Sequence, residues 1–387
     1  MKILHVNYYD VRGGAALAAY RLCQKQRELG IDAQMVVAEK FSDSPWVIPL
    51  PHGMVRKMRF LQHAEALWNR IAGKGGNFLP FSLNLFSVGA GDFIERIPCD
   101  VLHLHWINGQ MLSIGELPRF SRPVVWTLHD NWAYCGAEHY HLQGDERFVR
   151  GYEGWHTEDL VWKRKKNLWK DFFPVIVGPS RWISREAEAS QLFQKRRVEH
   201  IYNGIASEHF FPRSQAEARR YWGLSAEGPV IVTGAASLGD ENKGGKLLRD
   251  TLAHFPDTTV LAVGKNVSGE LHPKVLSAGS VSDPAILAMA YCAGDLFLSV
   301  ARYDNLPNML VESVACGTPV VAVDTGGVNE IVSAGNGITA PPDPQALAAA
   351  IGRILRKEIT FSPSAAVFDI TKAAGSYLEL YRSIAGH

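Results

Sequence analysis

Short apolar runs alternate with longer segments of helical periodicity along this chain. The apolar runs of the first half cover residues 2–7, 33–38, 101–105, 124–128 and 175–177. Those of the second half cover residues 230–233, 259–263, 296–299 and 320–323. Apolar strands that alternate with helices are typical of parallel sheets covered by helices. The pattern therefore predicts an α/β protein with two such sheets.

The length of 387 residues favours two domains. We expect the boundary near Asn203–Gly204, just after a short strand at 200–202. A last helical pattern over 368–384 comes too late to extend the second sheet, so we expect it to cross back onto the first domain. The predicted division is therefore 1–204, 205–364 and 365–387.

Composition excludes some partners and favours one compartment. The chain has 40 basic and 39 acidic residues, which offers no global charge for binding nucleic acid. Its five cysteines show no metal-binding spacing, and their odd number argues against a disulfide framework, so a reducing cytoplasm fits best. The first residues form a strand pattern, not a signal peptide, and no run approaches the roughly 20 apolar residues of a membrane span. We expect a soluble cytoplasmic protein, or one that is peripheral on the inner face of the membrane.

The segment 52–75 breaks the alternation with a basic amphipathic pattern. Its apolar stripe consists of Met58, Leu61, Ala64, Trp68 and Ile71, flanked by arginine and lysine. Such a helix either lies on an anionic membrane surface or packs on the sheet with its basic face in water. A second basic run bracketed by tryptophan, residues 162–170, allows the same two interpretations.

The most informative stretch is 304–322, which places two carboxylates around a short apolar helix. Asp304 precedes the helix and Glu312 lies inside it. Gly317 suits the position after a helix end, and a buried strand follows at 320–323. Both carboxylates can face one cleft and accept hydrogen bonds from sugar hydroxyls or a ribose diol. The alternative is a buried helix with one solvated Asp and one paired Glu.

Two glycine-containing loops are candidate phosphate sites. Gly13 and Gly14 open a helix after the first strand, where backbone amides can approach a phosphate. The loop lacks the GxGxxG pattern and its acidic partner, which disfavours a dinucleotide site. Lys243 stands with Gly244 and Gly245 at a second predicted helix start. The alternatives are an ordinary tight turn and a surface lysine.

Histidines stand at two strand ends. His129 ends one strand, where it can face a ligand or bond only to Asp130 or the backbone. His103 and His105 point to one side of another strand, but no third ligand is apparent, so we predict no metal site. The chain also contains no Asp-x-Asp pair, the usual short motif that holds a divalent ion against a diphosphate.

Together these segments resemble the retaining glycosyltransferases of family four, which have the GT-B fold of two Rossmann-like domains facing across a cleft. The motifs that carry the resemblance are the Gly-Gly loop, Thr-Leu-His-Asp at 127–130, Pro-Ser-x-Trp at 179–182, Ile-Tyr-Asn-Gly-Ile at 201–205, the Lys-Gly loop, Gly-Ser-Val at 279–281 and the Glu-x7-Glu-like segment 304–312. The stretch 126–134 and the Asp-Asn-Leu-Pro-Asn variant further resemble the colanic-acid type of bacterial exopolysaccharide and lipopolysaccharide enzymes.

The resemblance implies transfer of a hexose, with retention, from a nucleotide-diphosphate sugar to a lipid-linked, oligosaccharide or surface-polysaccharide acceptor. It implies no metal and no other cofactor, with the donor on the second domain and the acceptor on the first. The donor-binding residues it implies are Gly13, Gly14, Lys243, Ser280, Val281, Asp304, Asn305, Leu306, Asn308 and Glu312. Those it implies for catalysis are His129, Asp304 and Lys243. Within this set Glu312 would hold the ribose and Asp304 the sugar hydroxyls.

Three positions depart from the family pattern. Asp304 stands where Glu is usual, and Pro307 removes a backbone donor where glycine is common. The arginine that normally precedes the phosphate-loop lysine is missing, since 235–237 reads Ala-Ala-Ser, and Arg302 is a candidate replacement. Two alternatives stay open. One is a nucleotide-sugar epimerase or hydrolase of the same fold, and the other, suggested by the missing arginine, is a noncatalytic nucleotide-sugar-binding protein.

Overall fold

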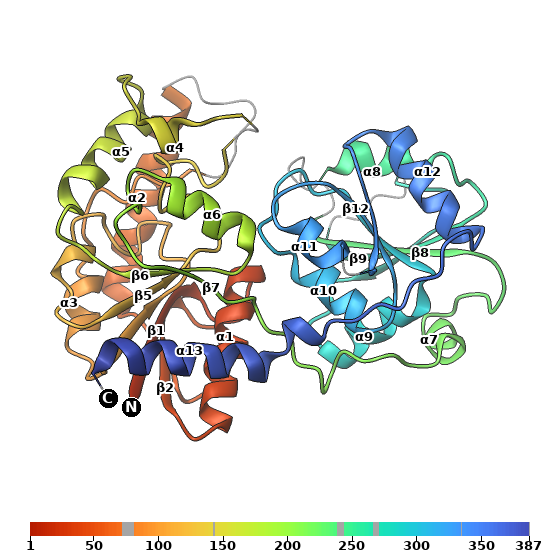
Figure 1. The fold of residues 1–387 in the computed structure, drawn as a ribbon, viewed down its shortest axis with the longest axis horizontal. Helices are drawn as coiled ribbons and strands as arrows, with labels where there is room; N and C mark the ends of the chain where they lie inside the picture. The colour runs from red at the N-terminus through yellow and green to blue at the C-terminus, as the bar shows by residue number, and fades with distance from the viewer. Residues whose placement is uncertain (72–80, 142–143, 238–243, 266–270, 334, 387) are drawn as a thin grey trace. The chain divides into compact units, whose positions relative to one another are not determined.

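A computed structural model describes residues 1–71, 81–141, 144–237, 244–265, 271–333 and 335–386. The chain divides into two compact units. Unit 1 comprises Met1–Tyr202 and Ala373–His387, and unit 2 comprises Asn203–Lys372. Each unit contains one parallel sheet with helices against it (Figure 1).

The sheet of unit 1 has seven strands among the described residues, in the order β3-β2-β1-β4-β5-β6-β7, and every pairing is parallel. The strands are β1 (Lys2–Tyr9), β2 (Asp32–Glu39), β3 (Val47–Pro49), β4 (Val101–Leu104), β5 (Val124–Thr127), β6 (Val175–Gly178) and β7 (Val198–His200). The strand order reverses between β1 and β4. In open α/β sheets, ligands bind outside the carboxyl ends of the strands at such a reversal.

The helices of unit 1 enclose one large apolar core. They are α1 (Gly14–Glu28), α2 (His52–Ile71), α3 (Ala90–Glu95), α4 (Arg147–Arg150), α5 (Thr157–Leu168) and α6 (Arg181–Ala189), with a 3₁₀ turn at Leu117–Arg119. The last helix of the chain, α13 (Ile370–Ala385), lies beside α1 (Figure 1). Gln26 of α1 and Tyr381 of α13 are hydrogen-bonded. The expectation that the C-terminal helix returns to the first domain is confirmed.

The sheet of unit 2 has the order β10-β9-β8-β11-β12-β13 over its described residues, again all parallel. Its strands are β8 (Val230–Ser237), β9 (Thr259–Lys265), β10 (Val275–Gly279), β11 (Leu296–Ser299), β12 (Val320–Val323) and β13 (Gly337–Ala340). Its helices are α7 (Gln215–Tyr221), α8 (Gly245–Leu252), α9 (Pro284–Ala293), α10 (Asn308–Ala315), α11 (Val328–Val332) and α12 (Pro344–Leu355), with a 3₁₀ turn at Ala366–Phe368. Here the order reverses between β8 and β11.

The described residues contain every strand that the apolar runs predict, and three more. β7 begins two residues before the predicted short strand at 200–202. The three additional strands are β3, β10 and β13. They are short, and their residues are mostly partly or fully exposed, so they lack the continuous apolar run that identifies a central strand.

The helix predicted over 52–75 exists as α2, but the predicted stripe is not its buried face. Met58 is buried, whereas Ala64 and Trp68 are exposed. The inner face includes Glu65, whose carboxylate accepts hydrogen bonds from Leu83 N–H and the Gln110 side chain. Because polar side chains such as Glu65 also lie on the inner face, the apolar residues alone did not identify that face.

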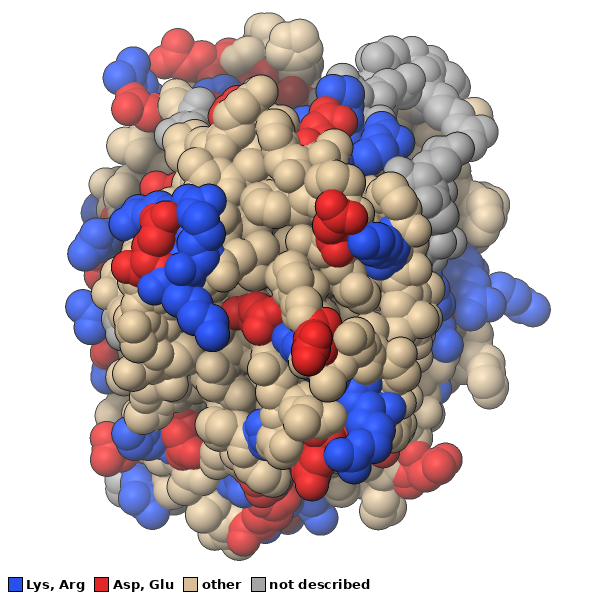
Figure 2. All heavy atoms as spheres, turned by 90° about the vertical axis from the view of Figure 1, so that its right-hand side faces the viewer, with Lys and Arg blue, Asp and Glu red and all other residues tan. Residues whose placement is uncertain are grey.

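No helix among the described residues is long and apolar enough to cross a membrane. On the face of unit 2 that Figure 2 turns to the viewer, basic and acidic side chains are interspersed between uncharged ones. This mixed surface agrees with the balanced charge of the chain.

Candidate functional site

In unit 2 the two predicted carboxylates lie on either side of the start of α10. β11 ends at Ser299, and the following loop carries Asp304, which is partly exposed. Asn305 and Leu306 are buried in the same loop, and α10 begins at Asn308 behind Pro307. Glu312 lies one turn into the helix and is only 3% exposed. A buried carboxylate is costly unless polar groups solvate it.

Tyr291 of α9 supplies such a group. Its hydroxyl donates a hydrogen bond of 2.8 Å to Glu312 Oε2. The tyrosine ring packs edge-on against Phe297 of β11, with ring centroids 5.5 Å apart. The helix, the strand and the carboxylate therefore hold one another in place.

Hydrogen bonds join this loop to the next one along the sheet edge. The carbonyl of Asn305 accepts a hydrogen bond of 2.9 Å from Gly327 N–H, just before α11. The hydroxyl of Thr325 donates to the carbonyl of Arg302 at 2.8 Å. The loops after β11 and β12 are thus tied together at two points. Arg302, the proposed substitute for the missing arginine, is exposed in this linked loop.

The glycine loop before α8 also approaches the end of β11. Gly244 caps α8 with a positive φ of 78°. A Cβ on Gly244 would lie 2.3 Å from the carbonyl oxygen of Val300, so only glycine fits this contact. The start of α8 therefore lies next to the loop that carries Asp304. Lys243 itself lies outside the described residues.

Ser280 and Val281 are less closely connected to this group. They follow β10, at an edge of the sheet, in the loop before α9. Asp283 caps α9 by accepting hydrogen bonds from Ala285 and Ile286. Two strands, β9 and β8, separate β10 from β11, so the carboxyl-end edge is shared but the loops are not adjacent.

In unit 1 the carboxylate of Asp10 fixes the start of the loop that leads to Gly13 and Gly14. Gly13 has a φ of 89° and caps α1, which begins at Gly14. The buried Asp10 carboxylate accepts hydrogen bonds from the backbone amides of Val11, Phe41 and Ser42. The first turn of α1 contains no acidic residue. Its amides can therefore receive an anion without a competing carboxylate.

His129 stands at the carboxyl end of β5, as predicted, and is partly exposed. Its Nε2 lies 3.1 Å from Nδ1 of His105. The neighbouring Asp130 instead binds the indole N–H of Trp106, the backbone of Trp132 and the ring of His139. Burial lowers the pKa of His129 to about 4, against a smaller raising effect of Asp130, so the ring is neutral at pH 7.

His5, His103 and His105 come together in the buried core, with ring nitrogens within 4.8 Å of one another. The sequence offered two of these residues, and the third comes from β1. Every ring nitrogen has a hydrogen-bond partner. The cluster is therefore a hydrogen-bonded network whose nitrogens are already engaged.

Comparison with known proteins decides what this architecture is. The model of the family described as "Glycosyltransferase Family 4" matches residues 12–209, more than half of the chain. The chain belongs to glycosyltransferase family 4. A second model, "Glycosyl transferases group 1", matches residues 229–357, so the enzyme is a glycosyltransferase over both units.

Two relatives and one solved structure illustrate the likeness. The putative colanic acid biosynthesis glycosyl transferase WcaC of Escherichia coli is 24% identical over 62% of this chain and 63% of its own length. The phosphatidyl-myo-inositol mannosyltransferase of Mycobacterium tuberculosis is 26% identical over 98% of this chain and 95% of its own. Anabaena HepE, solved in complex with UDP and glucose, superposes with a TM-score of 0.66 at 20% identity, over 99% of this chain and all of its own. The transferase thus has the GT-B fold.

Sequence reasoning missed a buried lysine in this glycosyltransferase. Lys165 of α5 is completely buried, and its Nζ donates to the carbonyls of Trp132, Cys135 and Gly136. It also lies 3.6 Å from the ring centroid of Trp132. Burial lowers its pKa to about 7. The run 162–170 is therefore not a uniformly solvated face, since this lysine ties α5 to the loop that follows His129.

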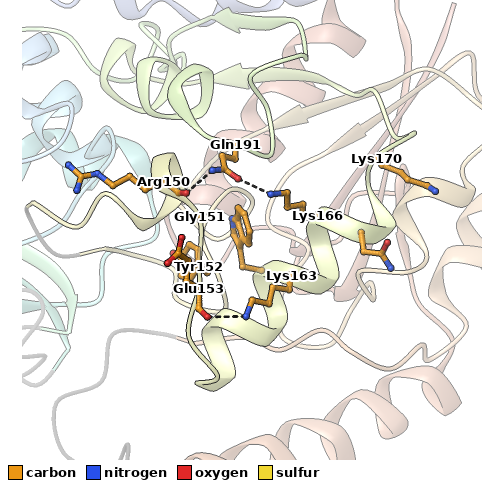
Figure 3. A pocket seen from close by; sticks show the side chains of 10 residues that line it. Arg150, Gly151, Tyr152, Glu153, Lys163, Lys166, Lys170 and Gln191 are labelled. Carbon is orange, nitrogen blue, oxygen red and sulfur yellow. Dashed lines mark hydrogen bonds between the residues drawn. The ribbon is translucent and has the colours of Figure 1, made fainter.

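A basic cavity lies on the outer side of the same helix (Figure 3). Its volume is about 610 Å³, and its lining includes Arg150, Lys163, Lys166 and Lys170 but only one carboxylate, Glu153. Lys166 donates to the Gln191 side chain at 3.0 Å, and Gln191 donates to the carbonyl of Arg150 at 2.7 Å. The excess of cations makes this cavity suited to an anionic group.

Proposed function

We propose that this glycosyltransferase moves a hexose, with retention, from a nucleotide-diphosphate sugar to a lipid-linked or surface-polysaccharide acceptor, without a metal ion. The names of its relatives support this choice, because they include a colanic acid enzyme and a mannosyltransferase that acts on phosphatidyl-myo-inositol. HepE, which shares the fold, was solved with UDP and glucose.

The observation that carries the proposal is the pair of carboxylates around α10. Asp304 is accessible on its loop, and Glu312 is oriented by the Tyr291 hydroxyl at 2.8 Å. Charge-assisted hydrogen bonds from hydroxyls to carboxylates are strong and directional. We assign Glu312 to the ribose and Asp304 to the hydroxyls of the hexose. Asn305, Leu306 and Asn308 complete the donor-binding loop.

We assign the remaining donor-binding residues for each unit by itself. In unit 2 we assign the diphosphate to Lys243 and the start of α8, and the base to the backbone around Ser280 and Val281. In unit 1 we assign anion-binding amides to Gly13 and Gly14, and a contact with the transferred sugar to His129. The linked loop of Arg302 offers the cation that replaces the missing arginine.

Transfer breaks the bond between the anomeric carbon and the diphosphate oxygen. An acceptor hydroxyl attacks the same face, forms the new C–O bond and passes its proton to the departing diphosphate. Amides at helix starts and a lysine stabilise the negative charge that develops on the leaving group. Such a step needs no protein base, which agrees with the lowered pKa of His129, because a ring with a pKa of about 4 is a weak base. The lack of an Asp-x-Asp pair in the sequence supports transfer without a divalent ion.

An exposed apolar surface of unit 1 supports peripheral membrane binding. It consists of Phe60, Leu67 and Trp68 of α2 with Trp155 and Leu160 at the start of α5, each at least 49% exposed. The indole N–H of Trp68 donates to the Thr157 hydroxyl at 3.4 Å, which joins the two helices. We call these five residues the α2–α5 surface.

Basic groups accompany the α2–α5 surface. Arg56, Lys57 and Arg59 are exposed on α2, and Lys163 lies 4.8 Å from the Trp155 ring centroid. Apolar and basic side chains together favour an anionic bilayer surface. We therefore place the enzyme in the cytoplasm, at the inner face of the membrane, with the basic cavity of α5 taking an anionic headgroup.

Donor binding and transfer test this function directly. A thermal-shift panel of UDP-, GDP- and ADP-hexoses identifies the donor, because a ligand of the folded state raises stability. Transfer from that donor to a lipid-linked acceptor extract is then measured with and without EDTA. We expect retention of configuration and no effect of EDTA. Rapid hydrolysis or epimerisation of the donor alone would favour the alternative enzyme. Donor binding without turnover would favour a noncatalytic binding protein.

A further inference from the structure

A continuous chain of hydrogen bonds runs from His129 into the core of unit 1. His129 Nε2 meets His105 Nδ1 at 3.1 Å, and His105 Nε2 meets His5 Nδ1 at 3.0 Å. His5 Nε2 then meets Gln26 Oε1 at 2.8 Å. His5, His105 and Gln26 are each at most 3% exposed, so water cannot replace these partners. Only the first member of the chain reaches the surface.

The amide of Gln26 sets the direction of this chain. Its oxygen can only accept, so His5 must carry its proton on Nε2 and accept on Nδ1. His105 must then donate from Nε2 and accept on Nδ1. His129 must in turn donate from Nε2 and keep a lone pair on Nδ1. One neutral tautomer follows for each ring, and each follows from the ring before it.

A second branch is compatible with the same amide orientation. The nitrogen of Gln26 donates to the hydroxyl of Tyr381 on α13 at 3.2 Å. That hydroxyl is then available to donate to His103 Nδ1 at 2.6 Å, and His103 Nε2 can donate to the Thr127 hydroxyl at 2.7 Å. Every link has one donor and one acceptor. To reverse the direction of the hydrogen bond at His129, the Gln26 amide must rotate and every hydrogen bond of this branch must reverse as well.

We propose that Gln26, through His5 and His105, fixes His129 as the neutral Nε2–H tautomer, so that His129 presents its Nδ1 lone pair as a hydrogen-bond acceptor for a substrate hydroxyl. Among the described residues Nδ1 of His129 has no hydrogen-bond partner, and the ring is partly exposed. Gln26, His5 and His105 are positioning residues, since none of them reaches the surface. The substrate contact rests on the proposed function, whereas the tautomer does not.

Burial is consistent with neutral rings along the chain. It lowers the pKa of His5 to about 4, although the bond to Gln26 opposes this effect. It lowers the pKa of His105 well below its usual range, and neighbouring histidines lower it further. A charged ring would donate from both nitrogens and would leave two donors facing each other in the core.

Nuclear magnetic resonance of the ¹⁵N-labelled wild-type protein at pH 7 tests the tautomer. Long-range ¹H–¹⁵N spectra distinguish Nε2–H, Nδ1–H and doubly protonated rings, and a His129→Asn spectrum identifies the signals of His129. We expect His129, His105 and His5 all as Nε2–H tautomers. An Nδ1–H or charged His129 would overturn the proposal. So would a change in these signals on addition of EDTA, since it would indicate a bound metal.

The role of Gln26 is tested with Gln26→Leu and its control Gln24→Leu. Gln24 lies on the exposed face of the same helix. We expect Gln26→Leu to populate both His129 tautomers and to lower kcat about tenfold with little change in the donor KM, which corresponds to the loss of about one hydrogen bond. We expect Gln24→Leu to change neither the His129 tautomer nor kcat. A single unchanged His129 tautomer in a folded Gln26→Leu protein would overturn the role of Gln26.

The two parts of the proposal fail separately. If no donor is turned over, the proposed function fails but the wild-type spectrum still decides the tautomer. If the tautomer is as expected and Gln26→Leu mixes it without changing kcat, the contact between His129 Nδ1 and the substrate is overturned.

Discussion

The hydroxyl of Tyr291 donates a 2.8 Å hydrogen bond to Glu312 Oε2, inside a helix where the carboxylate is almost completely buried. The bond orients the group that we assign to the donor ribose. In Tyr291→Phe, the ring still packs against Phe297, but the hydroxyl that donates the hydrogen bond to Glu312 is gone. A hydrogen bond to a charged group contributes about 1.5–3 kcal/mol, so we expect the donor KM to rise about tenfold or more with kcat little changed. Steady-state kinetics over donor concentration measure this split, and an unchanged KM would contradict the assignment of Glu312.

Asp304 is expected to be more important for turnover than for binding. Asp304→Ala removes a carboxylate that we assign to the transferred hexose, and we expect kcat and kcat/KM to fall together by about 100-fold in steady-state kinetics. Asp304→Glu restores the longer side chain common in the family and keeps activity within about tenfold. Asp324→Ala, in the neighbouring loop, is the matched control. Equal activity of Asp304→Ala and wild type would reject the site assignment under any reading of the function.

Lys165 is expected to make the stability of unit 1 increase as the pH rises from 7 to 10. Its pKa is about 7 in the folded protein because of burial, against about 10.5 when unfolded. The unfolded chain therefore binds more protons between pH 7 and 10, and this group adds stability as pH rises, by up to about 1.4 kcal/mol per pH unit. Lys165→Met loses three hydrogen bonds, which costs about 2–4 kcal/mol at pH 7, and also loses the rise.

Urea denaturation at pH 7, 8 and 9 measures both effects of Lys165→Met. Lys166→Met is the matched control, because Lys166 is the exposed neighbour on the same helix. We expect its unfolding free energy to stay within about 0.5 kcal/mol of wild type at each pH. Parallel pH dependences for wild type and Lys165→Met would contradict the assigned pKa.

The histidine core makes the enzyme sensitive to acid. His5 has a pKa of about 4 in the folded protein because of burial, against about 6.5 when unfolded. The unfolded chain binds more protons between these values, so stability falls as pH drops from 6.5 to 4. The full shift corresponds to about 3 kcal/mol for His5. Chemical denaturation at pH 7, 6 and 5 is expected to show a shallower loss in His5→Asn than in His52→Asn, whose histidine is exposed. Identical slopes would contradict this.

The α2–α5 surface is expected to bind anionic vesicles. Trp155 is 84% exposed and Leu67 58% exposed, and each buries apolar area only when a bilayer covers it. Replacing both with serine is expected to weaken binding to phosphatidylglycerol vesicles at least tenfold, and 0.5 M salt is expected to weaken wild-type binding. Phe173→Ser alters a 64% exposed aromatic residue after the other end of α5 and serves as the control. Binding to neutral phosphatidylcholine vesicles that equals binding to anionic ones would argue against the basic groups.

Local sequence was sufficient to find the central strands and the carboxylate loop. The central strands are buried on both faces, so each appears as a continuous apolar run. Gly317 follows the end of α10 with a φ of 81°, as the sequence predicts for a residue just past a helix. Asp304 and Glu312 are separated by only one short segment, so their relation follows from local structure alone.

Edge strands and inner helix faces were harder to predict. β10 and β13 are short and partly exposed, so no apolar run identifies them. On α2 the polar Glu65 faces inward while Trp68 faces outward, so the apolar stripe gave the wrong face. On α2 the tertiary hydrogen bonds of Glu65 outweighed the local pattern.

The sequence by itself therefore determined the two parallel sheets, the returning C-terminal helix and the candidate donor loop. Only the tertiary structure decided the surroundings of His129 and the burial of Lys165. His5 meets Gln26 across 21 positions and His105 across 100 positions of sequence. Parallel strand pairing brings such residues together, because β1 lies next to β4 although their paired residues, such as Ile3 and Val101, are 98 positions apart. The local sequence pattern does not show which distant residues become neighbours. The roles of Gln26 and Lys165 therefore follow only from the tertiary structure.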